Sequence, residues 1–141
     1  MKKDPRHRAR EAALQILYQW EIGRHDVARA TDTFFAHQWP NADPPSEEFR
    51  AFAAALARDT VGRLEAIDPL IASTSEKWRL ERLPVVDRLI LRMAICELLR
   101  DTSTPRAVVI NEALELARTF SHEGSVGFIN GMLDAIRKKL E

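Results

Sequence analysis

The chain has few cysteines and few glycines, and each scarcity excludes a class of protein. Its one cysteine, Cys96, excludes a disulfide framework and offers no spacing for a zinc site, which indicates a reducing compartment such as the cytoplasm. Five glycines supply no loop of the kind that cradles nucleotide phosphates. We expect no signal peptide before the fold, and no apolar run approaches the ~18 residues that a membrane span needs. We therefore expect no membrane association.

Excess charge of either sign is also missing. The chain has 21 basic and 21 acidic residues, so its formal net charge is zero, and any binding of nucleic acid has to come from a local patch. Its 141 residues, 45% of them hydrophobic, are enough for one domain with a proper core. We expect residues 1–141 to form a single globular domain.

Signals of catalysis are missing too. The four histidines are scattered without the spacing of a metal site or a nucleophile relay, and we expect each at the surface: His7, His25, His37 and His122. Carboxylate pairs such as Glu112 with Glu115 are ordinary on helix surfaces. We predict no catalytic residues, no metal and no cofactor.

Helical spacing of apolar residues runs through nearly the whole chain, and strand-like alternation is absent. This pattern predicts an all-α protein. A second helix is expected from about Asp26 to Trp39. In the third expected helix, apolar residues recur at helical spacing as far as Ile67. The expected starts of seven helices are Pro5, Asp26, Ser46, Asp68-Pro69, Pro84, Thr104-Pro105 and Ser125.

Positive charges crowd the first turns of the first helix. They are Lys2, Lys3, Arg6, Arg8 and Arg10. Cations at a helix start oppose the helix dipole and cost a few tenths of a kcal/mol each, whereas an anionic partner is attracted there. A phosphate chain is the simplest such partner. The alternative is a solubilising basic tip balanced by Glu11 and Glu21.

Two aromatic side chains fall outside the apolar stripes of their helices. Tyr18 lies on the arc opposite the stripe of Ala9, Ala13 and Ile16, on the same helix as the arginines. Phe128 lies roughly 110° from the stripe of the last helix, at ~100° per residue. Tyr18 therefore faces outward beside the basic cluster, and Phe128 can be a platform on which an unpaired RNA base stacks. Phe128 can equally be a wedge into a neighbouring helix.

The fifth helix, VVDRLILRMAICELL, is apolar around most of its circumference. Asp87 heads a strip that continues through Leu91, Ala94 and Leu98. An apolar strip that begins with one charge is typical of a protein docking surface, and we predict that Asp87 and Leu91 bind a partner. A partly exposed core helix has the same pattern.

Four segments resemble the bacterial transcription antitermination factor NusB family. They are RHRAREAALQILYQWE, VVDRLILRMAICELL, TPRAVVINEALELARTF and FINGMLDAI, in the family's order and over nearly the whole chain. The resemblance implies seven helices in two small bundles and no catalytic activity. It also implies binding to the boxA element of nascent RNA together with a ribosomal protein that acts as NusE, in a complex with other Nus factors on RNA polymerase.

The resemblance also carries roles for single residues. Arg6, Arg8 and Arg10 match the family's arginine-rich start, Tyr18 and Phe128 its RNA-contacting surface, and Asp87 an acidic position used in docking the ribosomal protein. Two departures lie before Phe128, where Gly124 and Gly127 replace an Asp and a Lys common in the family.

Two rival functions remain open at this point. The same fold forms the N-terminal RNA-binding domain of certain ribosomal-RNA cytosine methyltransferases, which would need a catalytic domain downstream. A helical adaptor that binds only protein would need a basic tip without a role in RNA binding. Salt-dependent binding of RNA separates this adaptor from the other readings.

Overall fold

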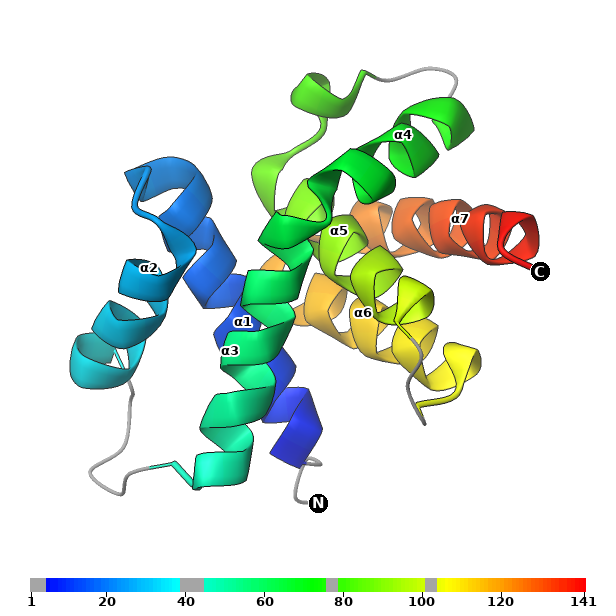
Figure 1. Ribbon diagram of the computed structural model, residues 1–141. Coiled ribbons are helices and arrows are strands. Elements are labelled where there is room, and N and C mark those ends of the chain that lie inside the picture. The colour runs from blue at the N-terminus through cyan, green and yellow to red at the C-terminus, as the bar shows by residue number, and fades with distance from the viewer. Residues whose placement is uncertain (1–4, 39–44, 76–78, 101–103) are drawn as a thin grey trace. The chain divides into compact units, whose positions relative to one another are not determined.

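A computed structural model describes residues 5–38, 45–75, 79–100 and 104–141 (Figure 1). Seven α-helices account for most of these residues and no strand occurs among them, which confirms the all-α prediction. The chain divides into two compact units, Met1–Val61 and Gly62–Glu141. No helix in the described ranges is long and apolar enough to cross a membrane.

The first unit contains α1 (Pro5–Gly23), α2 (Val27–Thr33), a π-helical turn (Phe34–Gln38) and α3 (Glu47–Gly62). Asp26 caps α2 by accepting a hydrogen bond from the backbone N–H of Arg29 at 3.0 Å. Ser46 caps α3 in the same way, with the N–H of Phe49 at 3.1 Å from its Oγ. The core of this unit is built by Ala9, Ala13, Ile16, Leu17, Ala30, Phe34, Ala53, Leu56 and Ala57.

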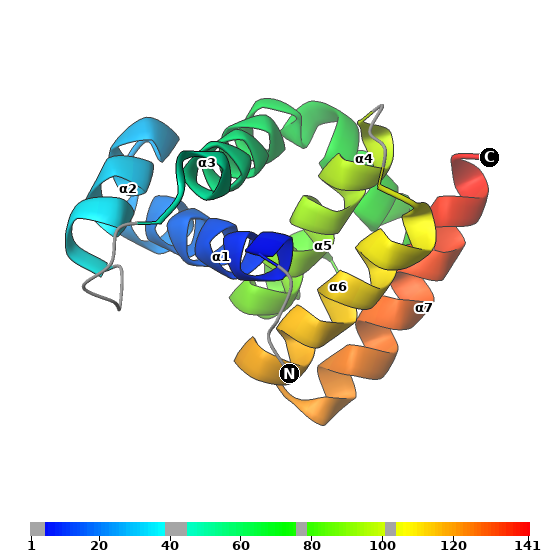
Figure 2. The ribbon, with the colours of Figure 1, turned by 90° about the horizontal axis from the view of Figure 1, so that it is seen from below.

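The second unit contains α4 (Leu64–Thr74), a short 3-10 turn (Leu80–Arg82), α5 (Val85–Leu99), α6 (Arg106–Phe120) and α7 (Glu123–Lys139). α5 packs against α4, α6 and α7, and every residue from 87 to 98 is buried. α6 and α7 lie side by side, as Figure 2 shows. The helix whose apolar residues extend around its axis is therefore the central helix of its unit.

Charged side chains on α5 are buried together with hydrogen-bond partners. Both oxygens of Asp68 on α4 accept hydrogen bonds from the Arg92 guanidinium, each at 2.9 Å. Arg88 donates to the backbone carbonyl of Leu80 at 3.3 Å. The two hydrogen bonds between Arg92 and Asp68 offset part of the cost of taking the Arg92 charge out of water.

Two predicted helix starts are wrong. α3 ends at Gly62, and Pro69 lies inside α4 rather than at its start. Ile67 and Ile71, four residues apart on either side of Pro69, are both fully buried, so their face of the helix is continuous across the proline. The last helix begins at Glu123, and Ser125 is a buried residue of its first turn instead of its cap. The predicted helix end at Trp39 lies outside the described residues.

Candidate nucleic-acid interface

The arginines at the start of α1 point to different sides of the helix. Arg6 and Arg10 are four residues apart, and both contact the ring of Phe52 on α3, with guanidinium carbons 5.4 and 5.2 Å from the ring centroid. Arg8, two residues from each, lies roughly 160–200° around the helix and is exposed. The basic segment therefore supplies two separate surfaces.

Arg8 begins a narrow stripe that follows the solvent side of α1. The stripe consists of Arg8, Glu11, Gln15, Tyr18 and Ile22, spaced alternately by three and four residues. Tyr18 is 42% exposed and Ile22 54%, and both are large hydrophobic side chains that the fold leaves in water. Tyr18 follows Arg8 by ten positions, or about 15 Å along the helix axis. This stripe, which we call the α1 stripe, joins one guanidinium to one aromatic face.

Arg10 does not fit the role predicted for it. Its side chain is 3% exposed, and its guanidinium lies against Phe52. A buried guanidinium cannot reach a phosphate without leaving the ring, so the expectation that Arg10 contacts RNA is not supported by its position. The sequence of α1 alone does not show that Arg10 contacts Phe52, because Phe52 lies on α3. Lys2 and Lys3, predicted for the same site, lie outside the described residues.

The histidines are at the surface with one exception. His25, His37 and His122 are exposed, as predicted. His7 is 5% exposed, and its Nε2 lies 3.7 Å from a carboxylate oxygen of Glu11. The prediction for His7 is wrong because the buried arc of α1 covers more than half of the helix.

Phe128 lies on α7 in the second unit and is half-buried. The next residue, Ile129, is fully buried and belongs to the apolar stripe, so Phe128 projects from the side of the helix, as its spacing predicts. Gly127 is exposed, and a Cβ there would meet no atom within 4 Å. The first atom of a side chain at that position would therefore lie in open space.

Asp87 and Leu91 are not on a surface. Asp87 is 3% exposed and Leu91 is completely buried, so the expectation of an exposed docking strip on α5 is wrong. The carboxylate of Asp87 accepts hydrogen bonds from Ser121 Oγ at 2.7 Å and from Ser125 Oγ at 2.6 Å. The sequence pattern does not single out Ser121 and predicts Ser125 only as a helix cap, because nothing in the local pattern shows that the turn before α7 folds onto α5.

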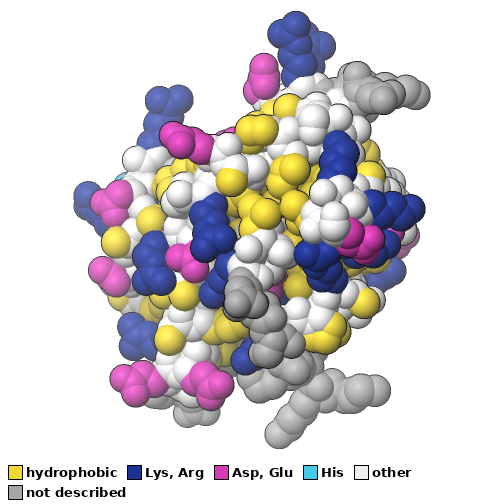
Figure 3. Space-filling view, turned by 45° about the vertical axis from the view of Figure 1, so that its right-hand side comes forward, with side chains coloured by type: hydrophobic (Ala, Val, Ile, Leu, Met, Phe, Trp, Pro, Cys, Tyr) yellow, Lys and Arg dark blue, Asp and Glu magenta, His cyan; other side chains and the backbone are white. Residues whose placement is uncertain are grey.

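Charge is mixed over the rest of the surface. On the face in Figure 3, basic and acidic side chains are interspersed, with hydrophobic side chains between them. This mixture agrees with the zero net charge of the chain. The described ranges contain no group of three or more His, Cys, Asp or Glu side chains placed so that they could hold a metal ion.

The comparisons with known proteins agree on one family. A sequence model of the NusB family matches residues 7–138. The transcription antitermination protein NusB of Solibacter usitatus is 45% identical over 139 residues, which cover 96% of this chain and 90% of the relative. The protein of the same name from Koribacter versatilis is 43% identical over 141 residues, covering 100% and 94% of the two chains.

Comparison with solved structures also indicates the NusB family. T. maritima NusB superimposes with a TM-score of 0.84 at 35% identity, covering 99% of this chain and 94% of the other. The crystal structure of the antitermination factors NusB and NusE in complex with dsRNA matches with a TM-score of 0.81 at 25% identity, covering 96% and 97%. By its sequence over nearly its full length and by its fold, the chain belongs to the NusB family.

Proposed function

We propose that this protein is a cytoplasmic transcription antitermination factor that binds single-stranded boxA-type RNA in nascent transcripts of ribosomal RNA operons. The observation that supports the proposal best is the α1 stripe, in which Arg8 and the exposed Tyr18 lie on one face of a helix. A guanidinium neutralises a phosphate, and an aromatic ring about 15 Å away along the helix axis stacks on a base. Relatives named as antitermination proteins supply the cellular process.

Each unit offers its own proposed RNA contacts. On the first unit, Arg6 and Arg8 are exposed and offer charge to the RNA backbone, and Tyr18 offers a stacking face. On the second unit, Phe128 on α7 offers a further stacking face. Lys2 and Lys3 would extend the basic segment toward the N-terminus. Phosphate contacts of this kind supply affinity, whereas stacked and hydrogen-bonded bases supply the preference for one sequence.

The proposed protein partner is the ribosomal protein that acts as NusE. The basis is a relative of the same fold that was crystallised with NusE and RNA. Other Nus factors and RNA polymerase complete the proposed assembly. Within it this chain would act by binding, without catalysis and without a cofactor.

The experiment is RNA binding with and without the ribosomal protein, using a boxA-like oligonucleotide and a scrambled one of the same composition. We expect the boxA-like RNA to bind more tightly, and the ribosomal protein to widen the difference. Equal affinity for the two RNAs in the presence of the ribosomal protein would contradict the assignment. Binding to the ribosomal protein but to no RNA would identify a protein-only adaptor.

A further inference from the structure

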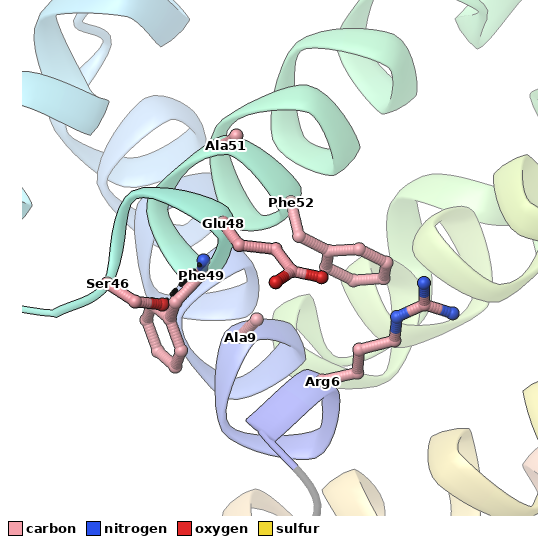
Figure 4. A pocket seen from close by; sticks show the side chains of 7 residues that line it. All are labelled: Arg6, Ala9, Ser46, Glu48, Phe49, Ala51 and Phe52. Atoms are coloured by element: carbon pink, nitrogen blue, oxygen red, sulfur yellow. Dashed lines mark hydrogen bonds between the residues drawn. The ribbon is translucent and has the colours of Figure 1, made fainter.

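A pocket of about 670 Å³ lies on the first unit between the start of α1 and the start of α3 (Figure 4). Ala9 on α1 and Phe49 and Phe52 on α3 form its apolar part. The pocket is also lined by Arg6 and Glu48. Both residues are exposed, so the pocket is open to solvent. Its volume falls in the range of about 300–1,000 Å³ that small-molecule sites occupy.

The aromatic walls of this pocket are held in place by their neighbours. The ring of Phe49 meets the ring of Phe35 edge-on, with centroids 6.4 Å apart. The ring of Phe52 carries the guanidinium of the buried Arg10 at 5.2 Å and that of the exposed Arg6 at 5.4 Å. Planar guanidinium groups and aromatic rings are the surfaces on which unpaired RNA bases stack.

Glu48 gives the pocket a polar group of one kind. Its carboxylate points toward the ring of Phe52 in Figure 4, and the residue is exposed. An ionised carboxylate accepts hydrogen bonds and donates none, so it pairs with amino groups of bases and is repelled by their carbonyl oxygens. Cytosine presents such an amino group at the position where uracil presents a carbonyl.

We propose that the pocket between Phe49 and Phe52 binds one unpaired RNA base that carries an exocyclic amino group, with Glu48 accepting its hydrogen bond and Arg6 contacting the adjoining phosphate. The proposal rests on the RNA-binding function proposed above and adds a site on the other side of α1. Because Arg6 and Arg8 point to different sides of that helix, an RNA that contacts both passes around the start of α1 and reaches this pocket.

The test compares short oligocytidine and oligouridine RNAs of equal length, which carry the same charge. We expect the protein to bind oligocytidine about fivefold or more tightly than oligouridine, the discrimination of one base-edge contact. Glu48→Gln should reduce this ratio to near one, because an amide donates as well as accepts. Glu47→Gln is the matched control: it removes the same charge from the same exposed helix turn but does not line the pocket. It should leave the ratio unchanged.

A second variant tests the stacking wall. Phe49→Leu keeps an apolar side chain against Phe35 and removes the aromatic face, so oligocytidine affinity should fall at least about fivefold while the thermal melt stays cooperative. Equal affinity of the unmodified protein for oligocytidine and oligouridine would overturn the pocket. So would an affinity ratio that falls to near one in Glu47→Gln as well as in Glu48→Gln. If one of these outcomes is found, but the protein still binds RNA and Tyr18→Ala weakens that binding, the proposed function stands without the pocket. Binding to no RNA overturns both.

Discussion

Ser125 Oγ on α7 lies 2.6 Å from Asp87 Oδ2 on α5, and both side chains are buried. Ser121 donates to the other carboxylate oxygen at 2.7 Å, so one carboxylate holds both ends of the turn between α6 and α7. The first turn of α7, where the helix dipole favours a negative charge, is thereby fixed to the central helix of its unit. Phe128 follows Ser125 by three residues, so the same contact sets the position of a proposed stacking residue.

Replacing Asp87 by alanine should destabilise the fold. The variant leaves two serine hydroxyls without their acceptor, and we expect the free energy of unfolding to fall by about 1–3 kcal/mol. Urea denaturation monitored by circular dichroism measures this loss. Asp32→Ala, an exposed position on α2, is the control and should change stability by less than about 0.5 kcal/mol. An Asp87→Ala protein as stable as the parent, with weaker binding of the ribosomal protein, would restore the docking role predicted from sequence.

Tyr18 should matter for RNA and not for folding. It is 42% exposed, so Tyr18→Ala should change the free energy of unfolding by less than about 0.5 kcal/mol. Loss of one stacked base should weaken RNA binding by about 1–3 kcal/mol, and Tyr18→Phe should retain most of the affinity. Ile22→Ala removes an exposed apolar side chain from the same stripe and serves as the control in the titration. Equal losses in Tyr18→Ala and Ile22→Ala would argue against stacking.

Phe128 combines packing with exposure, and two substitutions separate the two contributions. Phe128→Ala should cost less than the ~3–5 kcal/mol of a fully buried phenylalanine, because the side chain is half-buried. Phe128→Leu keeps apolar volume and loses the aromatic face, so it should remain close to the parent in stability and lose about 1–3 kcal/mol of RNA affinity. A Phe128→Leu protein that melts early and binds RNA normally would make Phe128 a core wedge.

Replacing Gly127, the residue before Phe128, by lysine should add stability and a contact with RNA. Gly127 is exposed within α7, and space is open around a side chain there, so Gly127→Lys should raise the free energy of unfolding by about 0.5–1 kcal/mol through helix propensity. The new cation beside Phe128 should steepen the slope of log affinity against log salt by about 0.7 if it contacts one phosphate of a single strand. Gly62→Lys, at the end of α3, is a control for added charge alone. A stabilised Gly127→Lys protein with an unchanged slope would mean that RNA does not pass this point.

Local patterns predicted much of the fold. The capping serine before α3, the prolines before α5 and α6 and the apolar circumference of α5 each depend on residues within a few positions, and each prediction is confirmed. Pro69 was misplaced because a proline favours a helix start locally, while burial of Ile67 and Ile71 keeps α4 continuous.

The candidate site was harder to predict, because its geometry depends on contacts between distant segments. Spacing alone put Tyr18 on an exposed arc, and the structure agrees. No local signal shows that Arg10 meets Phe52, 42 positions away in sequence, or that Ser125 turns toward Asp87. A cationic side chain in a basic run, such as Arg10, can therefore stabilise the fold by packing on a ring. A carboxylate on an apolar helix, such as Asp87, can be buried and hold a neighbouring turn by hydrogen bonds.

Arg8 is exposed and belongs to the proposed RNA-binding surface, whereas Arg10 is buried against Phe52 and stabilises the fold. The most direct measurement is the salt dependence of RNA affinity for Arg8→Ala and Arg10→Ala, together with their thermal unfolding. Arg8→Ala should flatten the slope of log affinity against log salt by about 0.7 and leave stability nearly unchanged. Arg10→Ala should retain the slope and lower the free energy of unfolding by about 1–2 kcal/mol, because it removes a buried cation–π contact with Phe52. An unchanged slope in Arg8→Ala, or a flattened slope in a fully stable Arg10→Ala protein, would show that the two arginines do not divide these roles.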